Sequence, residues 1–219
     1  MRLTPVYIIC SPRPQVGKTL IARQLTEFLK LLRGDVMAFD INLREPSLLD
    51  FLPRLTETAD IIDNFGKMQL MDRLIVNDGV AKVIDLGYHA FGECFTMIAE
   101  IGFMKEAARR GVRPMILFVA DTDRISARGY ELLCDQMPFD ALTVVDNEQV
   151  LRGELPRAYS HGPVLRIKAL APFLKTYVDR RDFSFTGSLR NEPDASTELN
   201  QWIRANYTSF RDMEMDLLR

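Results

Sequence analysis

The feature that most constrains the fold of this chain is a short polar loop between an apolar segment and an amphipathic one. Residues 5–10 form the apolar segment, and residues 19–32 carry Leu, Ile and Phe at helical spacing before a glycine at position 34. The loop ends in Gly17-Lys18-Thr19, at the start of the predicted helix. A strand, a loop with this ending and a helix form an arrangement that binds phosphate groups. The chain is therefore expected to fold around a phosphate-binding turn.

The residue types at the end of the loop indicate the chemistry of the ligand. Backbone N–H groups of Gly17, Lys18 and Thr19 would point at a β-phosphate from the positive end of the helix dipole. The Lys18 ammonium would neutralise β- and γ-phosphate oxygens, and the Thr19 hydroxyl would hold Mg²⁺. Val16 and Leu20 flank these residues and are expected to contact the same nucleotide. The pattern predicts a nucleoside triphosphate with Mg²⁺.

The rest of the chain alternates short β-branched apolar runs with longer amphipathic stretches. This alternation is typical of a parallel sheet covered by helices. No boundary divides the chain, which predicts a single domain over residues 1–219 with a C-terminal helix at about residues 196–217. The predicted strands are residues 5–10, 35–40, 81–86, 113–120, 141–145 and 164–167. The other predicted helices are residues 19–32, 47–52, 61–75, 91–110 and 125–136. Residues 182–194 are predicted to form a loop.

Composition narrows the class of protein further. The formal charge of −2 gives no net attraction to nucleic acid, so a DNA partner has no support from charge. Three widely spaced cysteines argue against a disulfide framework or a thiolate zinc site and suit a reducing compartment. No apolar run approaches the length of a membrane span. These features predict a cytoplasmic protein.

The start of the loop departs from the commonest phosphate-binding pattern, because Pro12 stands five residues before Gly17. The loop resembles the deviant P-loop of the ParA/MinD family, whose pattern is Lys-Gly-Gly-x-Gly-Lys-Thr. Arg13 then occupies the place of the signature lysine, while Pro14 and Gln15 replace two glycines. The resemblance implies that Arg13 reaches phosphates across a dimer interface. Pro14 removes one N–H donor, which weakens the expected binding.

A second resemblance follows the predicted strand at residues 35–40. Residues 40–48 resemble the Asp-x-Asp-Leu-Arg-x-Pro-Ser-Leu motif of the bacterial tyrosine-kinase branch, with Asp40 as the first acid and Asn42 as the second. In the alternative register Ala38 is first and Asp40 is the second acid, as in MinD. We prefer the first register because five further residues match it.

The two registers predict different catalytic groups. Asp40 would hold a Mg²⁺-bound water or orient the attacking nucleophile, although a carboxylate that caps the next turn is the alternative. Asn42 cannot accept a proton as a carboxylate does, so the first register predicts slow hydrolysis.

Two more positions match the family by their place after predicted strands. Asp85 ends the strand at residues 81–86 and resembles a Walker B aspartate that binds Mg²⁺ through a water. The family usually has Asp-Thr-Pro-Pro or Asp-Thr-Pro-Gly from this acid onward, whereas Leu-Gly-Tyr-His follows Asp85 in this chain, and Gly87 is expected to let this turn move. Asn147 lies where the family often places an asparagine that contacts adenine.

The resemblance implies a three-layer α/β P-loop NTPase fold, with a mostly parallel sheet of about seven strands and helices on both faces. It also implies an ATP-binding switch of the ParA/MinD type, acting in partition or positioning as a weak ATPase, a nucleotide-dependent homodimer and an unidentified protein partner. A tyrosine-rich tail is absent, which argues against a kinase.

Two alternative functions remain open. Residues 15–19 also resemble the loop of dethiobiotin synthetase, and amidotransferase relatives such as the cobyrinate enzymes share the fold. Such enzymes need a basic residue where this chain has Asp40 and Asn42. A scaffold without catalysis is the third reading, supported by Pro14 and Asn42.

Overall fold

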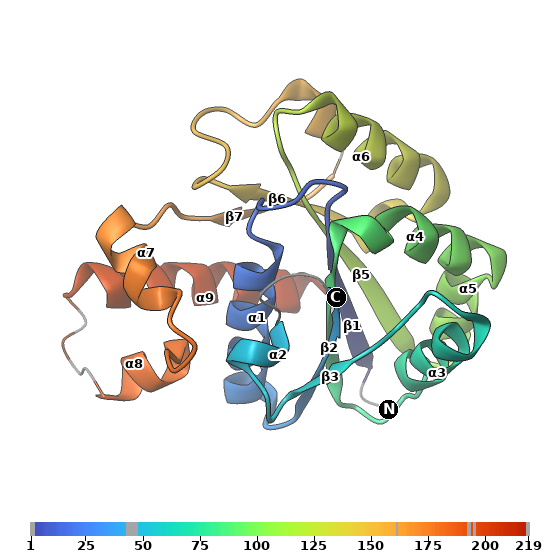
Figure 1. Ribbon diagram of the computed structural model, residues 1–219, viewed down its shortest axis with the longest axis horizontal. Helices are drawn as coiled ribbons and strands as arrows, with labels where there is room; N and C mark the ends of the chain where they lie inside the picture. Colours follow the sequence, from blue (N-terminus) through green and yellow to red (C-terminus); the bar gives the residue numbers. More distant parts are fainter. Residues whose placement is uncertain (1–2, 43–47, 161, 192–193, 195, 218–219) are drawn as a thin grey trace.

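The fold is built on one sheet of seven parallel strands, covered by helices on both faces (Figure 1). The computed structural model describes residues 3–42, 48–160, 162–191, 194 and 196–217 of the chain. The strands lie in the order β3-β2-β4-β1-β5-β6-β7. They are β1 (Thr4–Cys10), β2 (Val36–Ile41), β3 (Thr56–Thr58), β4 (Ala81–Leu86), β5 (Val112–Val119), β6 (Leu142–Asn147) and β7 (Val164–Ile167).

Strand β1 lies at the centre of the sheet and shows why these segments are apolar on both sides. Val6, Ile8 and Cys10 face one helical layer, and Tyr7 and Ile9 face the other. All five side chains are at most 1% exposed, as expected for a parallel strand covered on both faces.

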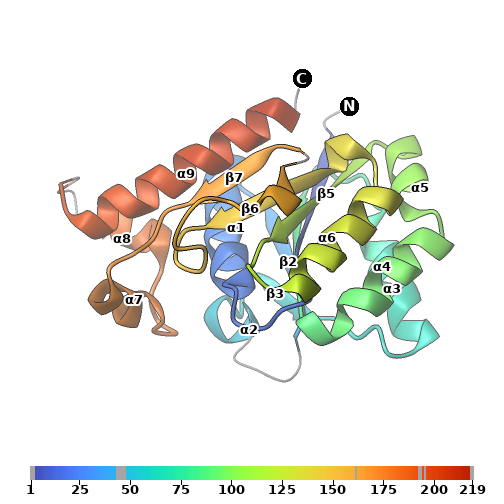
Figure 2. The ribbon, with the colours of Figure 1, turned by 90° about the horizontal axis from the view of Figure 1, so that it is seen from above.

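The helices form the two outer layers, which Figure 2 shows on opposite sides of the strands. One layer contains α3, α4, α5 and α6, and the other contains α1, α2, α7, α8 and α9. Their bounds are α1 (Lys18–Arg33), α2 (Leu48–Phe51), α3 (Asn64–Leu74), α4 (Phe91–Glu100), α5 (Phe103–Arg109), α6 (Arg124–Gln136), α7 (Pro172–Val178), α8 (Phe185–Asn191) and α9 (Glu198–Leu217).

The predicted fold class is confirmed, and the six predicted strands occur at their places in the sheet. The single helix predicted over residues 91–110 is wrong: it divides into α4 and α5 at Gly102, whose φ of 62° breaks the helical path. Strand β3 and helix α7 lie in segments without a predicted element.

The loop predicted over residues 182–194 is also wrong, because α8 lies within it. Glu27 of α1 holds the start of this helix. Its Oε2 accepts hydrogen bonds from the Ser184 hydroxyl at 2.6 Å and from the backbone N–H of Thr186 at 2.9 Å. A contact between residues far apart in sequence therefore decides the local structure, and composition alone does not reveal it.

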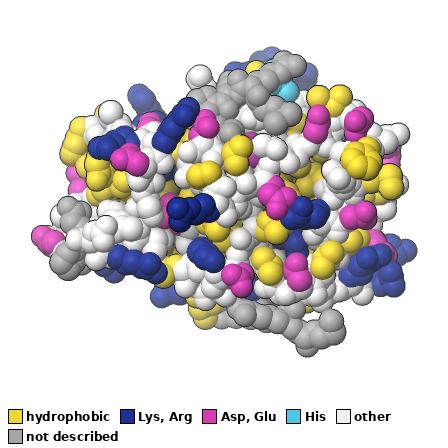
Figure 3. Space-filling model, turned by 60° about the horizontal axis from the view of Figure 1, so that its bottom comes forward, with side chains coloured by type: hydrophobic (Ala, Val, Ile, Leu, Met, Phe, Trp, Pro, Cys, Tyr) yellow, Lys and Arg dark blue, Asp and Glu magenta, His cyan; other side chains and the backbone are white. Residues whose placement is uncertain are grey.

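The surface carries charges of both signs. On the face in Figure 3, basic and acidic side chains are interspersed with apolar ones, without a continuous field of one sign. In the part of the chain that the structure describes, no helix is both long and apolar enough to cross a membrane.

Candidate nucleotide-binding site

The turn after β1 owes its shape to two residues with positive φ, Gln15 at 58° and Gly17 at 92°. Gly17 is the N-cap of α1, and its carbonyl accepts the backbone N–H of Ile21 at 3.0 Å. A Cβ at Gly17 would lie 2.5 Å from Nδ2 of Asn147, so space as well as φ requires glycine. Among the described residues, Gln15 is the only non-glycine with positive φ. The backbone thus keeps a glycine-like bend where the family's glycine is absent.

The other residues of the loop are anchored in the protein. A Cβ at Gly129 of α6 would meet the Pro12 ring at 2.9 Å, so this helix packs directly on the loop. Pro14 is half-buried, whereas Val16 is 2% exposed and packs in the core beneath α1. Leu20 packs at the edge of the same core. Val16 and Leu20 therefore have structural packing roles beside their predicted place at the nucleotide.

The two cations of the loop have different partners. Lys18 is 7% exposed and donates a hydrogen bond from Nζ to the carbonyl of Arg13 at 2.6 Å. Arg13 turns toward the loop after β5, where its Nε lies 3.8 Å from Asp121 and its Nη2 lies 3.6 Å from Asp123. Its guanidinium is therefore held by two carboxylates of its own chain. Sequence reasoning missed both acids, although each follows closely on a predicted strand.

The hydroxyl of Thr19 donates a hydrogen bond to Oδ2 of Asp85 at 2.6 Å. This contact joins the first turn of α1 to the end of β4, as the predicted Mg²⁺ site requires. Asp85 is fully buried, and its Oδ1 has no hydrogen-bond partner among the described residues. A buried carboxylate oxygen without a donor is a suitable partner for a divalent cation or its bound water. Thr19 and Asp85 thus fit Mg²⁺ accompanied by phosphates.

Burial dominates the electrostatics of Asp85. Burial is the largest effect and, despite the hydrogen bond from Thr19, raises the pKa of Asp85 to about 7. The Asp40 carboxylate raises this pKa further and the Lys18 ammonium lowers it. Asp40 and Asp85 are register partners on β2 and β4, which explains why their charges interact. A bound cation would favour the ionised form of Asp85.

Asp40 holds the backbone that follows β2. Its Oδ1 accepts the N–H of Asn42 at 2.9 Å, and its Oδ2 accepts the N–H of Leu49 in α2 at 3.0 Å. The capping alternative for Asp40 therefore describes its contacts in this structure. Asn42 is half-buried beside Gly87 of the β4 turn. Residues 43–47, which carry most of the match to the second motif, lie outside the described residues, so the two registers remain alternatives.

Asn147, at the end of β6, contacts the phosphate loop itself. Its Nδ2 donates to the carbonyl of Val16 at 2.9 Å, and its Oδ1 accepts the N–H of Gln149 at 3.2 Å. It is 2% exposed. The side chain thus fixes the loop from the β6 side of β1, and its contact with a base stays a prediction.

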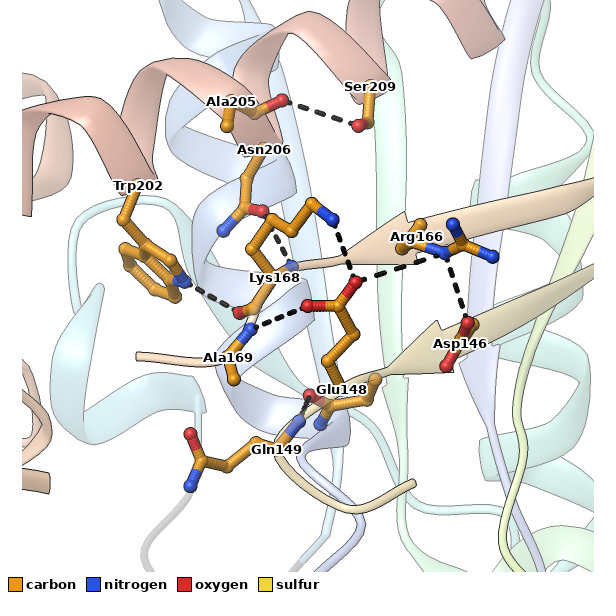
Figure 4. A network of polar contacts seen from close by, with 11 residues as sticks. Asp146, Glu148, Gln149, Arg166, Lys168, Ala169, Trp202, Ala205, Asn206 and Ser209 are labelled. Carbon is orange, nitrogen blue, oxygen red and sulfur yellow. Dashed lines mark hydrogen bonds and ion pairs between the residues drawn. The ribbon is translucent and has the colours of Figure 1, made fainter. Parts of the chain in front are cut away.

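Beyond Asn147, a network of polar contacts joins the ends of β6 and β7 (Figure 4). Glu148 accepts hydrogen bonds from Lys168 Nζ at 2.9 Å and from the N–H of Ala169 at 3.3 Å. Burial acts to raise the pKa of Glu148, but the hydrogen bonds from Lys168 and Ala169 together outweigh it and leave this pKa below its usual value. Arg166 donates from Nε to Asp146 at 3.2 Å. The network orders the loop that follows β7.

Helix α9 ties the same loop to the phosphate-loop helix. The indole N–H of Trp202 donates to the carbonyl of Lys168 at 2.7 Å, and Oδ1 of Asn206 accepts the N–H of Lys168 at 3.2 Å. Nδ2 of Asn206 donates to Gln24 of α1 at 3.1 Å. Sequence reasoning placed Trp202 only on an apolar helix face. Its polar role had no sequence signal, because the partner is a backbone carbonyl 34 residues away.

The comparisons with known proteins agree with this geometry at the level of the fold. No protein-family model and no curated protein sequence matches the chain. Among solved structures, the chain is similar to a chain of the MinC:MinD cell division protein complex of Aquifex aeolicus, with 18% identity, a TM-score of 0.57 and 96% of each chain covered. It is also similar to the MinD cell division protein of the same organism, with 20% identity, a TM-score of 0.53, and 96% of this chain and 97% of that chain covered. The chain therefore has the fold of MinD, the ParA/MinD-type P-loop fold that the loop after its first strand predicts.

Proposed function

We propose that this chain binds ATP with Mg²⁺ and works as a nucleotide-dependent switch of the ParA/MinD type. The observation that carries the proposal is the hydrogen bond between Thr19 and Asp85. It joins the loop after β1 to the aspartate of β4, the neighbouring strand in the sheet. Lys18 lies at the first turn of α1, where its ammonium can turn from the Arg13 carbonyl to phosphate oxygens. These groups match the requirements of a triphosphate with its metal.

We expect ATP hydrolysis to be slow. Pro14 has no N–H to offer the phosphates, and Asn42 has no carboxylate to accept a proton from water. Asp40 uses both oxygens to hold backbone N–H groups, so its carboxylate is better placed to order the turn after β2 than to act as a base. Such a site favours holding a triphosphate over cleaving it.

Nucleotide-dependent dimerisation and a protein partner belong to the same proposal. One of the similar solved structures is a complex of MinC and MinD, which supports a protein partner for a chain of this fold. In this chain Arg13 is paired with Asp121 and Asp123. To reach a nucleotide held by a second copy, it would have to exchange these carboxylates for phosphate oxygens.

A titration with ATP and ADP, with and without Mg²⁺, followed by light scattering, tests the proposal. We expect Mg²⁺-dependent binding of ATP and, with it, a doubling of the molar mass measured by light scattering. Lys18→Ala should abolish binding, whereas the matched variant Lys30→Ala on the exposed surface of α1 should bind normally. Absence of binding at millimolar nucleotide would contradict the proposal and favour a scaffold.

A small-substrate enzyme is the second candidate, and one observation favours it. A cavity of about 220 Å³ adjoins the site and is lined by Asn42, Gly87, His89, Asp60 and Glu93 among others. None of its described lining residues is Lys or Arg, which argues against the carboxylate substrates of the dethiobiotin synthetase type. Nucleotide binding without a change in the molar mass measured by light scattering would support this candidate over the switch.

A further inference from the structure

Tyr88 lies in the short turn between β4 and α4, three residues after Asp85. The centre of its ring is 5.9 Å from Nζ of Lys18, within reach of a cation–π interaction. The ring also contacts the ring of His89, with 3.7 Å between the ring centres and a tilt of 37° between the planes. The side chain is half-buried, and among the described residues its hydroxyl has no hydrogen-bond partner. A phenol group with a free donor thus lies beside the lysine of the phosphate loop.

The order of the strands shows which end of a nucleotide this tyrosine would meet. Strand β1, which carries the phosphate loop, lies between β4 and β5. Asn147 holds the loop from β6, on one side, and Asp85 holds it from β4, on the other. The metal-binding side of the loop therefore faces β4. Tyr88 follows β4 and lies on the side where the metal and the terminal phosphate of a triphosphate would be placed.

The backbone of this turn is held in place from two directions. A Cβ at Gly87 would lie 2.8 Å from the carbonyl oxygen of Ile41 and 3.2 Å from Cα of Asn42, so the turn packs closely against the end of β2. The carbonyl of Gly87 accepts the N–H of Ala90 at 3.0 Å, which leads the chain into α4. Close packing and this hydrogen bond limit the positions that the Tyr88 side chain can take.

Two residues of the loop and the turn offer no side-chain donor to a phosphate. Pro14 also lacks a backbone N–H, and Leu86, the residue directly after Asp85, has an apolar side chain that is fully buried in the core. The hydroxyl of Tyr88 is a side-chain donor close to Lys18. A phenol O–H that donates to a phosphate oxygen makes a charge-assisted hydrogen bond.

We propose that the Tyr88 hydroxyl donates a hydrogen bond to the terminal phosphate of a bound nucleoside triphosphate, and that this contact makes the site prefer the triphosphate to the diphosphate. The inference rests on the proposed function, because it requires that the loop binds a nucleotide. The ring of Tyr88 contributes separately, since its face attracts the Lys18 ammonium in either nucleotide state.

The test is a calorimetric titration of Mg²⁺-ATP and Mg²⁺-ADP into the wild-type chain, Tyr88→Phe and Tyr177→Phe. Tyr88→Phe keeps the ring and removes only the hydroxyl. We expect its affinity for ATP to fall roughly 10- to 100-fold, the range of a hydrogen bond to a charged group, while its affinity for ADP stays unchanged. Tyr177 is 48% exposed on α7, so Tyr177→Phe is the matched control and should leave both affinities unchanged.

The outcomes separate this inference from the proposed function. Equal losses for ATP and ADP in Tyr88→Phe, or no loss for either, would overturn the role of the hydroxyl while wild-type binding still supports the proposed function. A wild-type chain that binds neither nucleotide would overturn both. A thermal melt of Tyr88→Phe within about 1 °C of wild type shows that the comparison is between equally folded proteins.

Discussion

At the scale of single residues, the phosphate loop keeps the backbone path of its glycine-rich relatives with different side chains. Gln15 holds φ at 58°, a conformation that glycine adopts freely and that costs a residue with a Cβ about 1–2 kcal/mol. The ring of Pro14 fixes its own φ angle, and Pro14 has no N–H donor. The loop therefore stores a small strain that neighbouring contacts, including Asn147 on the Val16 carbonyl, must hold in place.

Replacing Gln15 by glycine should relieve this strain. We expect Gln15→Gly to raise the free energy of unfolding by about 0.5–1 kcal/mol, because the relief exceeds the extra entropy of glycine in the unfolded chain. Urea denaturation followed by circular dichroism measures the change. Gln15→Ala keeps a Cβ and serves as the control that should stay near wild type. A destabilised Gln15→Gly would mean that the amide side chain, not the backbone, sets the loop.

Asn42 is the residue at which hydrolysis is expected to be limited. Asn42→Asp would place a carboxylate beside the β4 turn, and a general base there should raise the ATP hydrolysis rate at least about tenfold. Phosphate release under saturating Mg²⁺-ATP measures it. Asn64→Asp, an exposed change of the same charge in α3, is the control. An unchanged rate in Asn42→Asp would favour the register in which Asp40 is the second acid.

At the scale of elements, hydrophobic periodicity predicted the strands and longer helices well, because each buries a continuous apolar face. It failed where one distant contact decides the structure. Glu27 holds the start of α8 through Thr186, within a segment that was predicted to form a loop. In the candidate site too, local sequence patterns were predictive and contacts between distant residues were not. Thr19 and Asp85 were predictable from motif and strand end, whereas the pairing of Arg13 with two acids after β5 was not.

The start of β4 provides an electrostatic prediction at this scale. Lys82 is 2% exposed, and its Nζ donates to Asp78 and to the carbonyl of Val76, each at 2.9 Å. Burial acts to raise the pKa of Asp78, but hydrogen bonds from Lys82 and Val80 outweigh it and leave this pKa below its usual value. Because the folded pKa is lowered, the contribution of Asp78 to stability is present above about pH 4 and is lost as the pH falls through the folded pKa.

Asp78 is 39% exposed, so solvent screens its pair with Lys82. Asp78→Asn should therefore lower the free energy of unfolding by about 0.5–1 kcal/mol at pH 7 and by progressively less below about pH 4. Chemical denaturation at several pH values measures the difference from wild type. Asp35→Asn is the control, since Asp35 and Lys30 form an exposed pair at 3.4 Å that should contribute less than about 0.5 kcal/mol. A pH-independent difference for Asp78→Asn would contradict an ionic origin.

At the scale of the whole molecule, α9 connects parts of the chain that lie far apart in sequence. It packs beside β7 and α1, on the layer opposite α3–α6 (Figure 2). Asn206 links it to Gln24 of α1, and Trp202 links it to the loop after β7. The C-terminal helix thus packs on the helix that begins with Lys18 and Thr19, without contributing a residue to the phosphate loop.

A buried ion pair joins Arg33 of α1 to Glu214 of α9. Nε of Arg33 donates to Oε2 of Glu214 at 2.9 Å, and the side chains are 6% and 3% exposed. Removing one partner leaves a buried charge without compensation, so Glu214→Gln should lower the free energy of unfolding by about 3–5 kcal/mol. Replacing both, as Arg33→Met with Glu214→Leu, should recover most of this loss because no buried charge remains.

Urea unfolding of the two variants and wild type measures this difference, with Asp212→Asn as the control. Asp212 and Arg211 form an exposed pair at 3.4 Å that should contribute less than about 0.5 kcal/mol. If Glu214→Gln behaves like the control, the pair does not hold α9 on α1. If the double variant is as unstable as Glu214→Gln, the packing of the two side chains, and not their charge, joins the C-terminal helix to the helix that carries Lys18 and Thr19.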